Sequence, residues 1–187
     1  MTAITAESMR QYKEFGTFTE SGGIEVARTP ERMQELARRI TSAKSWGIDG
    51  GRILTPAQVK ELVPYIDESI ILGGYYQPTV GVVDSLRTGT LMREEAAKMG
   101  AAQSFANIEV LDITVVDGRV TGVVTDQGTI AADYVVIATG CWSPKLAAMA
   151  GAHIPLTPAV HQMKDIGPVP FFAETKGDIE WPIVRDM

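Results

Sequence analysis

Apolar residues recur at helical spacing in the first hundred residues. Met33, Leu36 and Ile40 follow one another every three or four positions, which is typical of the inner face of an amphipathic helix. A threonine caps well because its hydroxyl accepts a hydrogen bond from a free amide of the first turn. The pattern therefore predicts a helix that Thr29 caps and that Gly47 ends.

The same start signal occurs twice more. Thr55-Pro56 places a capping hydroxyl before a proline at the first helical position, which predicts a shorter helix. Asp84 is the expected N-cap of a third helix, with Leu86 and Met99 among its inner positions and Gly100 at its end.

Farther along the chain the apolar period changes from the helical value to two. Val110–Val116, Val120–Thr125 and Thr129-Ile130 alternate in this way, and Asp117-Gly118 between the first two is a strong hairpin signal. These runs predict an antiparallel, three-stranded meander. An earlier alternating run, Gly23–Ala27, predicts a separate short strand.

A near-continuous apolar run, Tyr134–Ala138, follows the predicted meander. Such a run is typical of a strand buried on both faces, as in a parallel sheet. It ends at Thr139-Gly140, where small residues would let a dinucleotide approach the backbone, although any parallel strand can end in a glycine turn. A short helix through Ala150 comes next, and Ala159–Met163 is a further strand-like run.

Composition narrows the classes of protein. The 187 residues are 45% hydrophobic and 21% charged with a net charge of −6, which argues for a globular chain and against nucleic acid as a partner. A membrane span needs about 18 consecutive apolar residues, and the sequence contains no such run. One cysteine and the absence of a basic-then-apolar leader favour a cytoplasmic protein.

The residue types that carry chemistry are few. Two histidines, His153 and His161, without carboxylates at ligand spacing do not predict a metal site. By the local pattern alone His161 is a packed, hydrogen-bonded residue, Cys141 a small buried one, and Arg38-Arg39 a solvated pair. No Walker loop, nucleophile elbow or Gly-x-Gly-x-x-Gly is present.

Several rare landmarks occur in an order that resembles the FAD-dependent amine oxidoreductases of the DAO family, most closely the dimethylglycine oxidase and the dimethylglycine and sarcosine dehydrogenase group. The resemblance extends from about residue 20 to the end of the chain. Its landmarks are Gly22–Ala27, Ala43–Ile48, Leu54-Thr55-Pro56, Glu61–Asp67, Gly73–Pro78, Gly81–Asp84, Gly118–Val123, Ala132–Val136, Gly140-Cys141-Trp142 and Pro155–Gln162.

The resemblance implies an α/β fold and an internal fragment of a longer enzyme. The expected parts are a lead-in over 1–20, a substrate-domain or interdomain segment over 21–80, a partial FAD-binding domain of the glutathione-reductase-like type with a three-stranded meander over 81–152, and the start of the substrate-domain sheet over 153–187. The family's glycine-rich cradle and its covalent-attachment histidine are expected before residue 1, and an active-site tyrosine after residue 187.

The resemblance implies roles for five residues. Val110 matches the position whose backbone meets the adenine of FAD, and Thr139, Gly140 and Trp142 match the cofactor-facing end of the apolar run. His161 matches an active-site histidine beside flavin and substrate, a role that competes with the packed-residue interpretation.

The implied reaction is hydride transfer from an N-methyl amine, such as dimethylglycine or sarcosine, to the flavin, which gives an iminium ion. Oxygen or an electron-transfer flavoprotein would reoxidise the flavin, and no metal takes part. The alternative is a truncated, non-catalytic remnant or docking module without bound flavin.

Overall fold

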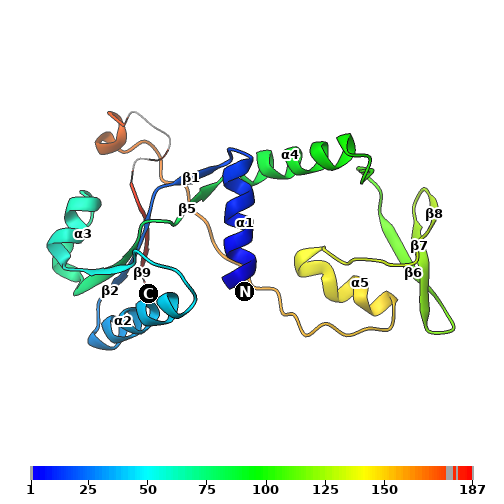
Figure 1. The fold of residues 1–187 in the computed structure, drawn as a ribbon, viewed down its shortest axis with the longest axis horizontal. Helices are drawn as coiled ribbons and strands as arrows, with labels where there is room; N and C mark the ends of the chain where they lie inside the picture. Colours follow the sequence, from blue (N-terminus) through cyan, green and yellow to red (C-terminus); the bar gives the residue numbers. More distant parts are fainter. Residues whose placement is uncertain (1, 176–178, 180, 187) are drawn as a thin grey trace. The chain divides into compact units, whose positions relative to one another are not determined.

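The computed structural model of the chain describes residues 2–175, 179 and 181–186. It divides into two compact units (Figure 1). The first comprises Met1–Ala102 with Pro168–Met187, and the second comprises Gln103–Gly167. Among the described residues, no helix is both long and apolar enough to cross a membrane.

The first unit contains helices and short strands. Its helices are α1 (Thr2–Glu14), α2 (Pro30–Ser45), α3 (Pro56–Leu62) and α4 (Ser85–Lys98), with single 3-10 turns η1 (Glu68–Ile70) and η3 (Pro170–Phe172). Its strands are β1 (Phe18–Glu20), β2 (Gly23–Ala27), β3 (Arg52–Leu54), β4 (Gly73–Gln77), β5 (Gly81–Val83) and β9 (Ile183–Asp186).

A four-stranded sheet in the order β3-β4-β2-β9 organises this unit. Strand β2 pairs antiparallel with β4 and parallel with β9, so the last described residues of the chain lie beside an early strand. The core is a cluster of buried aliphatic side chains from β2, β3, α3 and the loops that follow α3: Ile24, Val26, Leu54, Val59, Val63 and Ile71. Strands β1 and β5 form a separate antiparallel pair.

The predicted helix starts are confirmed. Thr29 accepts a hydrogen bond from the Arg32 amide at the start of α2. Thr55 and Gln58 form a reciprocal capping box on α3, and the Asp84 carboxylate accepts from the Arg87 amide at α4. These caps satisfy amides of the first turn that have no partner within the helix.

Residues 1–20, the expected lead-in, contain α1 and β1. One expectation for the first unit is not met. On α4, the expected inner residues Leu86 and Met99 are 86% and 74% exposed, and Thr88 is the buried one. The helix pattern was correct, but the other described residues place no apolar surface over that face.

The second unit is built on the predicted meander. Its strands β6 (Val110–Val116), β7 (Arg119–Thr125) and β8 (Gly128–Ala131) pair antiparallel in that order. Asp117 and Gly118 turn the β6–β7 hairpin with φ of 49° and 76°, the left-handed conformation that Asp-Gly favours in tight turns. The 3-10 turn η2 (Gly140–Trp142) leads into α5 (Ser143–Met149), which packs against β6 and buries Ala147.

The apolar run Tyr134–Ala138 is not a strand, which corrects the prediction of a strand buried on both faces. Tyr134 and Val136 are 90% and 87% exposed, because none of the described residues forms a strand beside the run. Ala159–Met163 is likewise without secondary structure, and Val160 is 98% exposed. A sequence pattern specifies which side chains favour burial, but a neighbouring strand has to supply the partner hydrogen bonds and the cover.

Candidate functional site

The second unit contains all the residues that the sequence assigns to the flavin and the amine. Thr139 and Gly140 lie where the apolar run turns into η2, and Trp142 ends this 3-10 turn. Gly140 has a φ of 56°, and a Cβ placed on it would meet no atom within 4 Å. The backbone at this turn is therefore open to a ligand, and a side chain there would project into the same open space.

Val110 begins β6, opposite Thr125 of β7. Because β6 has one partner strand among the described residues, alternate amides and carbonyls face outward along its other edge. A register shift between Val110 and Asp112 marks a bulge directly after this residue. Bulges redirect a strand at the edge of a sheet, so the backbone around Val110 departs from regular pairing.

This arrangement fits part of a flavin nucleotide. An outward strand edge offers the backbone donors and acceptors that an adenine edge requires, and an open glycine turn allows close approach. Packing of α5 against β6 brings the turn at Gly140 and the strand of Val110 into one compact unit. The sequence has no Gly-x-Gly-x-x-Gly to cradle the pyrophosphate.

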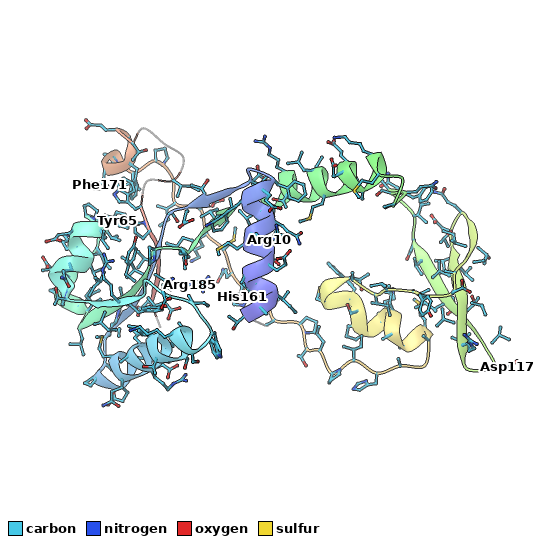
Figure 2. The ribbon with its side chains drawn as sticks, in the orientation of Figure 1. Arg10, Tyr65, Asp117, His161, Phe171 and Arg185 are labelled. Carbon is cyan, nitrogen blue, oxygen red and sulfur yellow. The ribbon has the colours of Figure 1, made fainter. Side chains whose placement is uncertain are left out.

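The remaining candidate residues are exposed. Trp142 is 68% exposed, and Cys141 is exposed as well, which corrects the expectation of a small buried residue. His161 is exposed on a segment without secondary structure (Figure 2), so it is not the packed core residue that the local pattern favoured. No hydrogen bond or ion pair among the described residues joins His161 to Thr139, Gly140 or Trp142.

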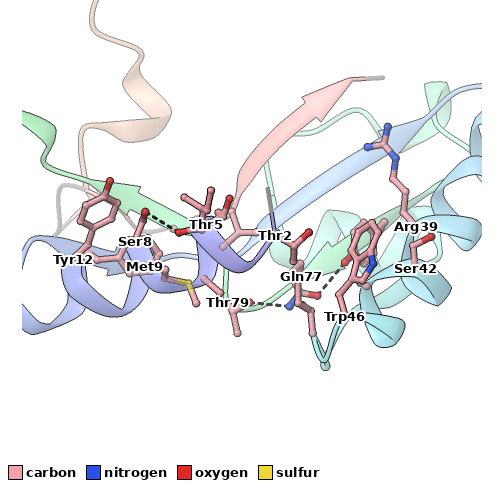
Figure 3. A pocket seen from close by; sticks show the side chains of 18 of the residues that line it. Thr2, Thr5, Ser8, Met9, Tyr12, Arg39, Ser42, Trp46, Gln77 and Thr79 are labelled. Carbon is pink, nitrogen blue, oxygen red and sulfur yellow. Dashed lines mark hydrogen bonds between the residues drawn. The ribbon is translucent and has the colours of Figure 1, made fainter. Parts of the chain in front are cut away.

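A cavity of about 980 Å³ lies in the first unit, where the sequence predicts no site (Figure 3). Helix α1 forms one wall and α2 the other, with β4 and the residues before β5 between them. The signal for the α2 wall is a stripe at helical spacing, Glu35, Arg39, Ser42 and Trp46, which mixes charged, polar and aromatic side chains and so does not stand out as an apolar face.

Arg39 is not the solvated residue that the sequence predicts. Its side chain is 32% exposed and bonds two carboxylates, Glu25 at 2.5 Å and Glu35 at 3.1 Å. Hydrogen bonds from Arg38 and Arg39 lower the pKa of Glu35 to about 2. Burial, and secondarily the nearby Glu25 carboxylate, raise the pKa of the Tyr75 hydroxyl at the cavity.

The described residues also form a second cavity, but no group of metal ligands. A cavity of about 540 Å³ in the second unit is lined by Arg119, Val120, Asp133, Tyr134 and Val135. No three or more His, Cys, Asp or Glu side chains of the described part of the chain are grouped so that they could hold a metal ion.

The profile of the family described as DAO, FAD dependent oxidoreductase, matches residues 1–187. The chain belongs to this family. Its members use FAD, and the open turn at Gly140 and the free edge of β6 are compatible with part of that cofactor.

Curated relatives include amine dehydrogenases. The chain is 32% identical to mitochondrial sarcosine dehydrogenase of Mus musculus over 76% of its length and 29% identical to mitochondrial dimethylglycine dehydrogenase of Rattus norvegicus over 91%. It is also 31% identical, over 69% of its length, to the mitochondrial pyruvate dehydrogenase phosphatase regulatory subunit of Mus musculus. The chain spans 16%, 19% and 14% of these three relatives.

Solved structures of other proteins are also similar to this chain. L-proline dehydrogenase from P. horikoshii matches with a TM-score of 0.74 and 27% identity, and glycine oxidase from Bacillus cereus with 0.61 and 30%. The matches cover 79% and 78% of this chain and 40% of each of those chains. They confirm the predicted α/β fold of the DAO type. The domain boundaries deduced from the sequence remain a prediction.

Proposed function

We propose that the chain forms part of a flavoprotein that oxidises an N-methyl amine of the dimethylglycine or sarcosine type. The observation that carries the proposal is the family match over residues 1–187, joined to the similarity with sarcosine and dimethylglycine dehydrogenases. At 29–32% identity the family is conserved while substrates differ among its members, so the amine is named by class.

The second unit holds the cofactor side of this site. The backbone of Val110 at the free edge of β6 pairs with the adenine, and the open turn at Thr139-Gly140 admits the cofactor beside the main chain. Trp142 is exposed on the same turn and offers its indole as a packing surface. When bound, FAD supplies the hydride acceptor, and the amine becomes an iminium ion.

His161 is the protein group assigned to the amine. As a general base, its imidazole would take the proton of the amine and keep the amine in the neutral form that gives up hydride. The exposure of His161 leaves its ring free to reach a substrate. The reoxidant, whether oxygen or an electron-transfer flavoprotein, and the cytoplasmic location stay predictions.

A second candidate function rests on a different relative. The similarity to a phosphatase regulatory subunit supports a non-catalytic docking or regulatory role within the same fold. This role requires no flavin and no histidine beside a substrate. Flavin binding by the chain therefore separates the two candidates.

The decisive experiment is a titration of the 187-residue chain with FAD, followed by the perturbation of the visible flavin band and by equilibrium dialysis. Gly140→Ala should weaken FAD binding, because the new methyl group projects into the space where the cofactor meets the backbone. Gly151→Ala is the matched control, because Gly151 also has a positive φ, 71°, and open space around it, without a predicted cofactor role. No binding by the parent chain would favour the docking role, and equal affinities for the two variants would remove Gly140 from the cofactor site.

The role of His161 has its own test in the FAD-loaded chain. His161→Asn should slow anaerobic flavin reduction by dimethylglycine or sarcosine, because the variant lacks the imidazole that takes the proton of the amine. His153→Asn is the control, because His153 is an exposed histidine of the same unit. The same reduction rate for both variants would remove His161 from the site.

A further inference from the structure

The cavity of the first unit shares no residue with the predicted flavin and amine site. On α1 the side chains of Thr2, Thr5, Met9 and Tyr12 recur at helical spacing, and on α2 those of Glu35, Arg39, Ser42 and Trp46 do the same. The two stripes line opposite walls of the same space (Figure 3). A ligand there would contact two helices that lie outside the second unit.

The size and lining of the cavity suit a small organic molecule. Its volume of about 980 Å³ lies at the upper end of the range for small-molecule sites, about 300–1,000 Å³. Aromatic and aliphatic side chains dominate the lining, among them Met9, Phe18, Trp46, Ile48 and Val80. Trp46 is 63% exposed although its indole borders this space, so a ligand would cover apolar surface that the protein leaves open to water.

The charges at the cavity are already compensated. Arg38 and Arg39 both bond Glu35, and Arg39 also bonds Glu25 behind the wall, which leaves two cations against two carboxylates. Each cation is hydrogen-bonded to a carboxylate, so the wall carries no net charge. The electrostatics of the wall therefore match a neutral molecule.

The polar groups on the floor of the cavity already form hydrogen bonds with one another. Gln77 is 7% exposed, and its amide donates to the Asp49 carbonyl at 3.0 Å and to the Thr79 hydroxyl at 2.8 Å. Its carbonyl oxygen accepts from the Tyr75 hydroxyl at 3.1 Å. Gly51 lets these groups meet, since a Cβ there would lie 2.7 Å from the Gln77 oxygen. These hydrogen bonds hold Tyr75 and Gln77 in place. The floor therefore presents the rigid ring of Tyr75 to a ligand rather than unpaired polar atoms.

We propose that this cavity is a second ligand site, which binds a neutral, mainly apolar aromatic molecule between α1 and α2. The aromatic class follows from the wall, where the rings of Tyr12, Phe18 and Trp46 offer faces and edges for offset packing. We expect a neutral ligand because the charged side chains at the wall already form ion pairs with one another. The site is independent of flavin binding, so its test needs neither FAD nor an amine.

The test uses N-phenyl-1-naphthylamine, a neutral aromatic dye whose emission rises when it leaves water, titrated into the 187-residue chain. Trp46→Ala should weaken its binding at least about ten-fold, because that change removes a wall of the site. Ala43→Trp should abolish binding by filling the space, since Ala43 lines the cavity. Leu86→Ala is the matched control, because Leu86 is an exposed apolar side chain of the same unit outside the cavity.

The outcomes distinguish a small-molecule site from general hydrophobic adsorption and from self-association of the chain. Unchanged dye affinity in Trp46→Ala, with a native melting profile, overturns the proposal even if Ala43→Trp fails to fold. Equal losses in Trp46→Ala and Leu86→Ala show general hydrophobic adsorption and overturn it too. A dimer in sedimentation that the dye dissociates would show that a second copy of the chain occupies the cavity instead of a small molecule.

Discussion

Gly122 is the position where one added methyl group should most directly break the meander. It lies in the central strand β7, opposite Thr114 of β6 and Ala131 of β8. Its φ is 155°, and a Cβ built on it would lie 2.2 Å from the Ile130 carbonyl oxygen and 3.1 Å from the Ala131 Cα. Both of these atoms belong to the main chain, so no side-chain rotation relieves the contact.

Gly122→Ala should therefore lower the free energy of unfolding of the second unit by about 2–5 kcal/mol. Overpacking against a backbone costs about 1–3 kcal/mol, and a conformation that disfavours a side chain adds about 1–2 kcal/mol. The larger value applies if β8 separates from β7, because the four residue pairs of that ladder would be lost.

Urea denaturation followed by far-ultraviolet circular dichroism, together with hydrogen exchange of the β7 and β8 amides, measures the effect. Gly128→Ala is the matched control, because Gly128 begins β8 with a φ of 130° and nothing within 4 Å of its Cβ position. The difference between the variants isolates the contact from the backbone term. Stabilities that agree within about 0.5 kcal/mol would refute the steric reasoning, since that is the scatter of ordinary surface substitutions.

Two further predictions concern the first unit. Glu35→Gln should destabilise the chain at pH 7 and have a clearly smaller effect near pH 2. Hydrogen bonds from Arg38 and Arg39 hold the pKa of Glu35 at about 2 against an ordinary 4.5, so its contribution is fully present above 4.5 and is lost as the pH falls through the folded-state value. Melting temperatures of both proteins between pH 7 and pH 2 measure this, and a constant difference across that range would contradict it. Thr55→Ala should cost about 1 kcal/mol by removing the capping box of α3, whereas Thr41→Ala on α2, where the hydroxyl bonds a carbonyl four residues earlier, should change stability by less than about 0.5 kcal/mol. Equal losses in thermal melts would show that the cap is not the cause.

Local signals were sufficient for the elements that need few partners. A capping hydroxyl acts within one turn, so Thr29, Thr55 and Asp84 identify helix starts without knowledge of the fold. Asp117-Gly118 defines its hairpin in the same way, because only certain residues tolerate the left-handed conformation at both turn positions. The rare landmarks also identified the family, which residues 1–187 match.

One part of the candidate site could be predicted from the sequence, and another part could not. Sequence identified Val110, Thr139, Gly140, Trp142 and His161 by resemblance, and the structure adds that the glycine turn is open and that β6 has a free edge. The first-unit cavity was not predictable, because its walls come from α1 and α2 and its floor from β4, elements separated by long stretches of sequence. The sequence predicts a solvated Arg39 for the same reason: Glu25, one of its partners, lies on a different element.

The sequence by itself determined where α2, α3, α4 and the β6–β7 hairpin begin and to which family the chain belongs, because capping, turn conformation and motif order are properties of adjacent residues. Tertiary structure alone decided which apolar side chains are covered. Tyr134–Ala138 has the composition of a buried strand and is nevertheless exposed, since burial requires a second strand that no local pattern specifies. The cavity between α1 and α2 likewise exists only because two distant stripes of side chains face each other.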